Sequence, residues 1–198
     1  MKIAPDQLLT SSEVGVLLQV NPSSVKKWVD DGLIQAFRTP GGHRRIRPSD
    51  LVEFLHKHRM PIPRDLQDAA RRRLLIVDDD VTQLKALGRA LSRHSDRIEV
   101  VTTANGIDAL VLVGSFQPNL VILDVFMPGI DGLEVCRRLK ANPETRGIHV
   151  IIVSGHVTAP LKKKALEAGA VSCLNKPVDV QELLSILEET SPVEAGAL

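Results

Sequence analysis

Residues suited to phosphate chemistry follow four apolar, strand-like stretches in the second half of the chain. These residues are Asp78, Asp79 and Asp80 after 74–77, Asp124 after 120–123, Ser154 after 150–153 and Lys176 after 171–175. In an open parallel sheet, ligands bind outside the carboxyl ends of the strands, near the point where the strand order reverses. We therefore expect the side chains to meet in one crevice. Carboxylates together with a hydroxyl and an ammonium suit a divalent cation and a phosphoryl group better than an organic substrate.

Strand-like and amphipathic helical stretches alternate from Leu74 onward, and they would position these residues. The expected strands are 74–77, 98–102, 120–124, 149–153 and 171–174, and the expected helices are 82–93, 106–114, 132–140, 161–168 and 180–189. Leucines at 84, 87 and 91 follow the spacing of one helix face. Five strand–helix pairs predict an α/β domain with a doubly wound, five-stranded parallel sheet and right-handed crossovers.

The first sixty residues predict a small, mainly helical domain. Thr10 and Glu13 form a capping box that opens a short helix, and Asn21–Pro22 supplies the cap and first-turn proline of a second helix, which Gly32 closes. Two short helices with a tight turn between them indicate a helix-turn-helix. A hairpin is expected over 33–47, with its turn at 40–42, and a third helix runs to about residue 58.

These patterns give a domain at 1–60, a linker at 61–73, a second domain at 74–190 and a flexible tail at 191–198. The linker is placed after the third helix because the prolines at 61 and 63 interrupt a helical pattern.

Composition fits a globular protein outside the membrane. The 198 residues are 43% hydrophobic, with a formal net charge of +1, and no apolar stretch approaches the ~18 residues of a membrane span. No signal peptide opens the chain, so we expect a cytoplasmic protein. Residues 1–60 carry nine Lys or Arg against six Asp or Glu, whereas residues 74–198 carry twelve against sixteen. This asymmetry suggests a polyanion partner for the first domain and a cation site in the second.

The second domain resembles the receiver domain of two-component response regulators, which has a flavodoxin-like fold. The resemblance rests on LLIVDDD at 74–80, DVFMPGIDG at 124–132, VSG at 153–155 and NKP at 175–177. It implies that Asp124 accepts a phosphoryl group, a reaction open to a carboxylate nucleophile. It also implies that Asp78 and Asp79 hold Mg²⁺ together with Asp124, that Ser154 and Lys176 bind phosphoryl oxygens, and that the 176–177 peptide bond is cis.

Asp80 and Cys173 differ in their expected roles from the residues of this pocket. Asp80 is better suited to capping the following helix than to binding the metal. Cys173 stands where receivers usually carry Tyr or Phe, so an aromatic switch in the fifth strand is absent and another element would have to report phosphorylation.

The first domain resembles the winged helix-turn-helix module of the MerR and excisionase type. The resemblance rests on LTSSEV at 9–14, VKKWVDDGLI at 25–34 and TPGGHRRI at 39–46. It implies that the second helix enters the major groove of double-stranded DNA and that the hairpin grips the backbone or the minor groove. The expected contacts are Ser23, Ser24, Lys26 and Lys27 on the helix, and Arg38, His43, Arg44 and Arg45 on the hairpin.

Together these features predict a DNA-binding response regulator, not an enzyme in the ordinary sense. A histidine kinase or a phosphotransfer protein would supply the phosphoryl group, and pairing of two copies on DNA would come from the receiver or from neighbouring sites. Two alternatives remain open. The first domain could bind a protein, with phosphorylation controlling sequestration, or the chain could be a phosphorelay intermediate that does not bind DNA.

Overall fold

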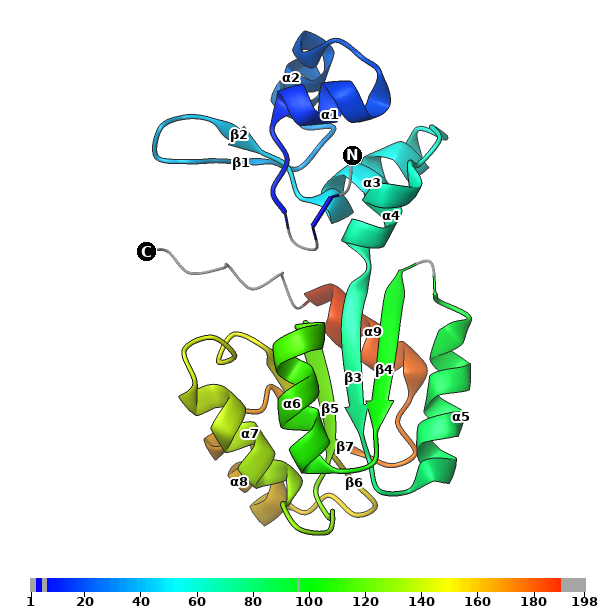
Figure 1. Cartoon of the computed structure of the whole chain (residues 1–198), viewed down its shortest axis with the longest axis vertical. Coiled ribbons are helices and arrows are strands. Elements are labelled where there is room, and N and C mark those ends of the chain that lie inside the picture. Colours follow the sequence, from blue (N-terminus) through cyan, green and yellow to red (C-terminus); the bar gives the residue numbers. More distant parts are fainter. Residues whose placement is uncertain (1–2, 5–6, 96, 190–198) are drawn as a thin grey trace. The chain divides into compact units, whose positions relative to one another are not determined.

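The computed structural model describes residues 3–4, 7–95 and 97–189 of the chain. It forms two compact units, Met1–Arg71 and Arg72–Leu198. The expected tail at 191–198 lies outside the described residues. Figure 1 gives the labels of the helices and strands in both units.

The N-terminal unit is built from short helices and one small hairpin. Its elements are α1 (Ser11–Leu18), α2 (Pro22–Asp30), β1 (Phe37–Arg38), β2 (Arg44–Arg45), α3 (Pro48–Lys57) and α4 (Arg64–Ala70). The predicted caps are confirmed: Thr10 and Glu13 form both hydrogen bonds of a capping box, and Asn21 caps α2 with Pro22 in the first turn. Gly32 follows α2 with φ of +71°, a left-handed conformation that favours glycine at the end of a helix.

The hydrophobic core of this unit explains why the helices stay together. Leu9, Val14, Val25, Leu51 and Leu55 are fully buried and belong to one cluster. The Trp28 ring packs on Phe54 with a centroid distance of 4.9 Å, so Trp28 is partly buried against this core.

Helix α4 occupies much of the stretch 61–73 that the sequence suggested as a linker. Leu66 is fully buried and Ala69 is nearly so, and both belong to the core cluster of the N-terminal unit. Pro63 occupies the N-cap position of α4. A proline is tolerated at the start of a helix because the missing N–H would have no helical partner there, so the same residue that stops one helix can precede the next.

The second unit alternates five strands with five helices within the described residues. The elements are β3 (Arg72–Val77), α5 (Val81–Ser92), β4 (Ile98–Thr103), α6 (Gly106–Phe116), β5 (Leu120–Asp124), α7 (Gly132–Ala141), β6 (His149–Ser154), α8 (Ala159–Glu167), β7 (Ser172–Asn175) and α9 (Val180–Glu189). All strands are parallel in the order β4-β3-β5-β6-β7, and the predicted doubly wound sheet is confirmed. The order reverses at β3 and β5, which places the expected crevice beside their carboxyl ends.

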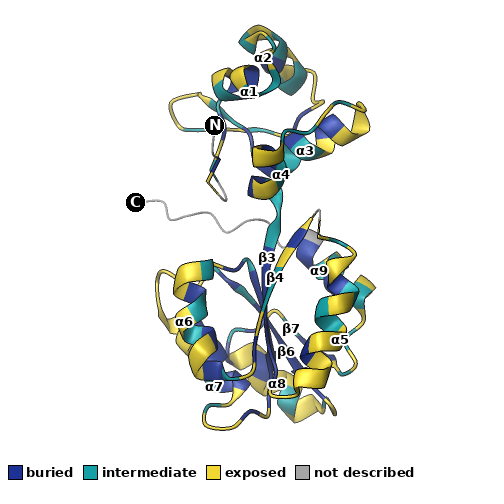
Figure 2. Ribbon diagram, turned by 45° about the vertical axis from the view of Figure 1, so that its right-hand side comes forward, coloured by how far each residue is buried: buried dark blue, intermediate teal, exposed yellow. Residues whose placement is uncertain are grey.

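Helices cover both faces of this sheet (Figure 2), with α6 and α7 on one side and α5 and α9 on the other. Successive residues of β3 point to opposite faces, as the period of a strand requires. Leu75 and Val77 join the core beneath α6 and α7, whereas Leu74 and Ile76 join the core beneath α5 and α9. Two apolar layers therefore fix the strands whose ends carry the polar residues.

Over the described residues, no helix is both long and apolar enough to cross a membrane.

Candidate functional site

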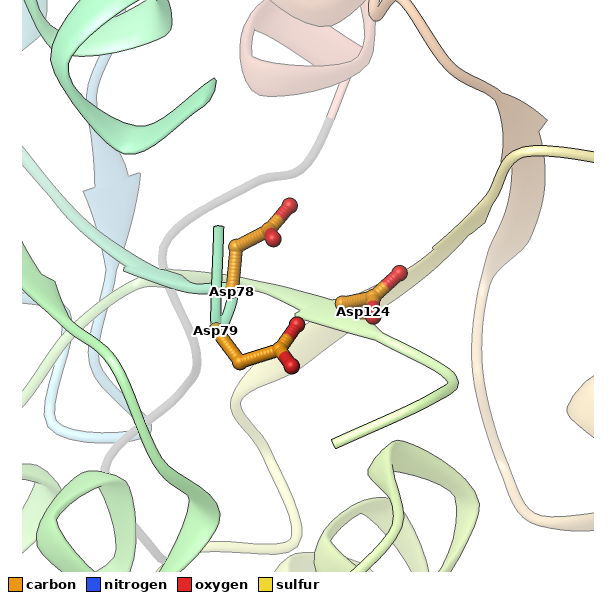
Figure 3. Close-up of side chains that lie close together, drawn as sticks. All are labelled: Asp78, Asp79 and Asp124. Atoms are coloured by element: carbon orange, nitrogen blue, oxygen red, sulfur yellow. The ribbon is translucent and has the colours of Figure 1, made fainter. Parts of the chain in front are cut away.

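Three carboxylates gather at the carboxyl edge of the sheet. Asp78 and Asp79 follow β3, and Asp124 is the last residue of β5. Because β3 and β5 are hydrogen-bonded neighbours, with Val77 opposite Leu123, the three side chains lie close together (Figure 3). One ligand oxygen from each lies within 4.8 Å of the others. Asp78 and Asp124 are buried and Asp79 is exposed, so the cluster opens to solvent on one side.

The ammonium group of Lys176 lies between the two buried carboxylates. Its Nζ is 2.6 Å from Oδ2 of Asp78 and 2.7 Å from Oδ1 of Asp124. Lys176 follows β7, and its peptide bond to Pro177 is cis, which confirms the expectation from the resemblance. The structure thus brings together four of the predicted residues, with Lys176 neutralising charge that would otherwise be buried without compensation.

The surroundings of Asp124 disfavour its ionised form. Burial raises the pKa of the Asp124 carboxyl above its usual value, and the nearby Asp78 and Asp79 add to this, whereas the contact with Lys176 acts in the opposite direction. Burial by itself would lower the pKa of Lys176, but hydrogen bonds to Asp124 and Asp78 outweigh it and the pKa is raised. A cation that enters the cluster would relieve the repulsion among the carboxylates.

Backbone contacts hold the two buried carboxylates in place. The N–H of Phe126 donates to Oδ2 of Asp124 at 3.1 Å, and the N–H of Asp80 donates to Oδ1 of Asp78 at 2.9 Å. A Cβ added to Gly132 would lie 2.1 Å from the carbonyl oxygen of Asp124, so only glycine allows α7 to start this close to the end of β5.

Asp80 caps α5, as the sequence suggested. Its Oδ1 accepts hydrogen bonds from the N–H groups of Thr82 at 2.8 Å and Gln83 at 3.2 Å. These bonds account for its carboxylate without a metal, so the candidate ligands are the other three acids.

Ser154 ends β6 and is 1% exposed. It follows Val153, which is the register partner of Asp124, so it belongs to the same edge of the sheet. Its Oγ accepts from the N–H of His156 at 3.3 Å within its own turn. Cys173 is buried in the core beneath α6 and α7, and burial raises the pKa of its thiol.

The predicted DNA-facing residues lie on α2 and on the hairpin of the N-terminal unit. On α2, Ser23, Lys26 and Lys27 are exposed and Ser24 is half-buried. The hairpin residues differ among themselves: Arg38 and His43 are exposed, whereas Arg44 and Arg45 are half-buried.

Asp30, which sequence reasoning missed, is an ion-pair partner of two hairpin arginines. Nη2 of Arg44 lies 2.5 Å and 2.8 Å from the two carboxylate oxygens of Asp30, and Nη2 of Arg38 lies 3.6 Å from one of them. The hydrogen bond from Arg44 holds the pKa of Asp30 below its usual value. An acidic residue at the end of a helix rich in basic residues was a signal in the sequence, but its partner depends on how the hairpin folds.

Comparisons with known proteins agree with both halves of this description. The sequence model of the response regulator receiver domain matches residues 74–188, and that of a helix-turn-helix domain matches residues 8–59. The chain belongs to the response regulator receiver family, with a helix-turn-helix domain before the receiver. This combination of domains is typical of signalling proteins.

Particular relatives fit the same class. Response regulator MprA of Mycobacterium sp. (strain KMS) is 36% identical over 126 residues, and MprA of Mycobacterium tuberculosis (strain ATCC 25618 / H37Rv) is 34% identical over 128 residues. These matches cover 62% and 63% of this chain but only 53% and 54% of those proteins, so the chain spans about half the length of the curated relatives it matches.

Solved receiver domains show the same fold. The signal receiver domain of a DNA binding response regulator protein (merR) from Colwellia psychrerythraea 34H has a TM-score of 0.56 and 29% identity, and the match covers 60% of this chain and 96% of that one. The receiver domain of Francisella response regulator 1452 has a TM-score of 0.54 and 25% identity, with 61% and 96% covered.

Proposed function

We propose that this protein is a DNA-binding response regulator in which Asp124 accepts a phosphoryl group and the N-terminal unit binds double-stranded DNA under the control of that modification. The observation that carries the proposal is the cluster of Asp78, Asp79 and Asp124, bridged by Lys176, in a chain that also contains a helix-turn-helix domain.

The donor set of the cluster fits Mg²⁺. Three carboxylates offer hard oxygen ligands, and the exposed side of the cluster leaves room for the waters that Mg²⁺ retains. Asp78, Asp79 and Asp124 would hold the ion. When bound, Mg²⁺ would supply positive charge to the oxygens of a transferring phosphoryl group.

The residues of the chain have distinct parts in the transfer. A carboxylate oxygen of Asp124 forms a bond to phosphorus while the bond between phosphorus and the donor's histidine nitrogen breaks, and the proton needed by that nitrogen comes from the donor or solvent. Lys176 gives up its contact with the carboxylates and neutralises a phosphoryl oxygen, and the hydroxyl of Ser154 donates a hydrogen bond to another. In the product a phosphoryl group with about −1.5 to −2 charges replaces the single negative charge of the Asp124 carboxylate.

The donor is a histidine kinase or a phosphotransfer protein, as membership in the receiver family implies. On the output side, α2 would enter the major groove, with Ser23, Ser24, Lys26 and Lys27 near bases and phosphates. The hairpin beside it would contact the backbone, and two copies would pair on DNA through their receivers or by binding adjacent sites.

Phosphorylation is tested with a small-molecule phosphodonor and Mg²⁺. Wild type should give a retarded band on a phosphate-affinity gel and gain the mass of one phosphoryl group. Asp124→Asn should give neither, whereas Glu167→Gln, which changes an exposed acid of α8 outside the site, should behave as wild type. Equal modification of wild type and Asp124→Asn would refute the assignment of the phosphoacceptor.

Wild type and Asp124→Asn, each with and without phosphodonor treatment, are then titrated with duplex DNA at several salt concentrations. Binding that weakens with salt and differs between wild type and Asp124→Asn after phosphodonor treatment is the expected result. A failure to bind any duplex would favour a protein partner for the N-terminal unit.

A further inference from the structure

Helix α2 and the hairpin are joined by an ion pair in which the arginine is more buried than the carboxylate. Arg44 reaches both oxygens of Asp30, and its side chain is only 20% exposed, whereas that of Asp30 is 49% exposed. Nε of Arg44 is buried and has no hydrogen-bond partner among the described residues. The guanidinium therefore lies against the body of the unit and does not extend from the hairpin.

The register of the hairpin creates a need for a counter-ion at this place. Arg38 and Arg44 are directly opposite each other on β1 and β2, on the same face of the hairpin. Like charges in such a cross-strand pair are destabilising. The Asp30 carboxylate contacts Arg44 and lies 3.6 Å from Arg38, so it offsets the repulsion between them.

The position of Asp30 in α2 is unfavourable for the helix alone. Asp30 is the last helical residue and Asp31 is the C-cap, so two acids stand at the end of the helix where the macrodipole is negative. Lys27 is the basic residue of the last turn. The bond to Arg44 gives Asp30 a second positive charge nearby, in direct contact with its carboxylate.

A carboxylate that accepts two hydrogen bonds from a guanidinium offers the same kind of acceptor as a DNA phosphate. While Asp30 holds Arg44, this arginine cannot neutralise a phosphate. Arg38, which is 58% exposed and farther from Asp30, can do so.

We propose that Asp30 is a positioning residue that ties the hairpin to α2 through Arg44 and withholds Arg44 from DNA. This proposal rests on the proposed binding of DNA and refines it: Arg44 acts as a structural link, and the phosphate contacts of the hairpin come from its exposed cations. Asp30 thereby limits non-specific affinity and fixes the spacing between helix and hairpin.

The salt dependence of DNA binding distinguishes a phosphate contact from a structural link. The full chain is titrated with a labelled duplex of random sequence between about 50 and 200 mM NaCl, because each lost phosphate contact flattens the plot of log K against log salt by about 0.9. Arg44→Gln should leave the slope unchanged, and any loss of affinity should be the same at every salt concentration. Arg38→Gln is the matched control on the opposite strand and should flatten the slope by about 0.9.

Asp30→Asn completes the test. It releases Arg44, so it should strengthen non-specific binding and steepen the slope. In the Asp30→Asn background, Arg44→Gln should now flatten the slope by about 0.9, although it has no such effect in wild type. Asp30→Glu, which retains the carboxylate, should stay close to wild type. Equal effects of Arg44→Gln in both backgrounds would overturn the proposal, since they would mean that Asp30 does not restrain Arg44.

A measurement without DNA separates this proposal from the proposed function. Trp28 is the single tryptophan and the chain has no tyrosine, so its fluorescence reports urea unfolding of the N-terminal unit alone. Asp30→Asn and Arg44→Gln should each lower the unfolding midpoint, and the double variant should lower it by less than the two shifts added together. If wild type binds no duplex, the proposed function fails. The non-additivity of the two shifts in the unfolding midpoint still shows whether Asp30 and Arg44 are linked. Additive shifts would show that no link exists.

Discussion

Lys176→Met is expected to destabilise the receiver unit strongly in the absence of divalent metal. The side chains of Lys176, Asp78 and Asp124 are 14%, 7% and 6% exposed, so the substitution leaves two buried carboxylates without their shared counter-ion. Removing one partner of a buried pair costs about 3 to 5 kcal/mol. Because the cluster opens to solvent at Asp79, we expect a loss near the lower end, about 3 kcal/mol, or roughly 10 °C in Tm for a domain of this size.

Titration of Lys176 itself does not limit the effect near neutral pH. The pKa of Lys176 is raised by its contacts with the carboxylates, so its contribution is complete below the unfolded pKa of 10.5 and is lost only as pH rises through the still higher folded pKa. At neutral pH Lys176 is therefore charged in both the folded and the unfolded state, and the loss should be measurable there.

Mg²⁺ provides the decisive comparison. Unfolding is followed by far-UV circular dichroism in EDTA and again with saturating Mg²⁺. The metal should stabilise the Lys176→Met variant more than wild type, because in wild type it competes with an ammonium group already between the carboxylates. Most of the deficit of the variant should therefore disappear in Mg²⁺.

Lys163→Met serves as the control, since Lys163 is 78% exposed and pairs with Glu167 at 3.8 Å on the surface of α8. It should change stability by no more than about 0.5 kcal/mol. Trp28 fluorescence, which reports on the N-terminal unit, should give the same unfolding curve for Lys176→Met, Lys163→Met and wild type. A Lys176→Met variant that is as stable as wild type in EDTA, or equally destabilised with and without Mg²⁺, would refute the reasoning from charge neutralisation.

Three further predictions concern the capping box, a close backbone approach and pH. Thr10→Ala removes the capping box of α1 and should destabilise the N-terminal unit by about 1 kcal/mol, measured from Trp28 fluorescence in urea. Gly132→Ala should destabilise the receiver by about 1 to 3 kcal/mol and slow phosphorylation by displacing Asp124. Gly114→Ala, which has open space around its Cβ, should instead stabilise α6 by about 0.5 to 1 kcal/mol. Unfolding curves of both variants check these two expectations. Because the pKa of Asp124 is raised, protons should compete with Mg²⁺ at a higher pH than for an ordinary carboxyl, and calorimetric titrations across pH should show this step in wild type but not in Asp124→Asn.

The acidic cluster could be predicted from the sequence because strand ends fix it. Once 74–77 and 120–124 are recognised as buried parallel strands, the residues that follow them must emerge at one edge. The position of Lys176 between two carboxylates could not be predicted, because it depends on distances of a few ångströms among side chains from three strands. The sequence indicated only its affinity for phosphoryl oxygens.

The N-terminal unit shows the limits of local patterns more clearly. Helix α4 was missed because prolines at 61 and 63 end one helix and are equally compatible with the start of another. The pairing of Asp30 with Arg44 joins residues fourteen positions apart, and it follows from where the hairpin folds. Basic residues in the sequence therefore suggested DNA contacts without showing which of them already have an acidic partner.

Strand β3 connects the N-terminal unit to the acidic cluster along the chain. Its first residue, Arg72, adjoins the N-terminal unit, and its last residue, Val77, precedes Asp78, so covalent connection and chemistry lie at opposite edges of one sheet, about 20 Å apart. β3 is hydrogen-bonded on both sides, to β4 and β5, and cannot slide without breaking both ladders. We therefore expect β3 to keep its register when Asp124 is phosphorylated, so that any structural change that reaches the N-terminal unit would involve the loops and helices around the sheet.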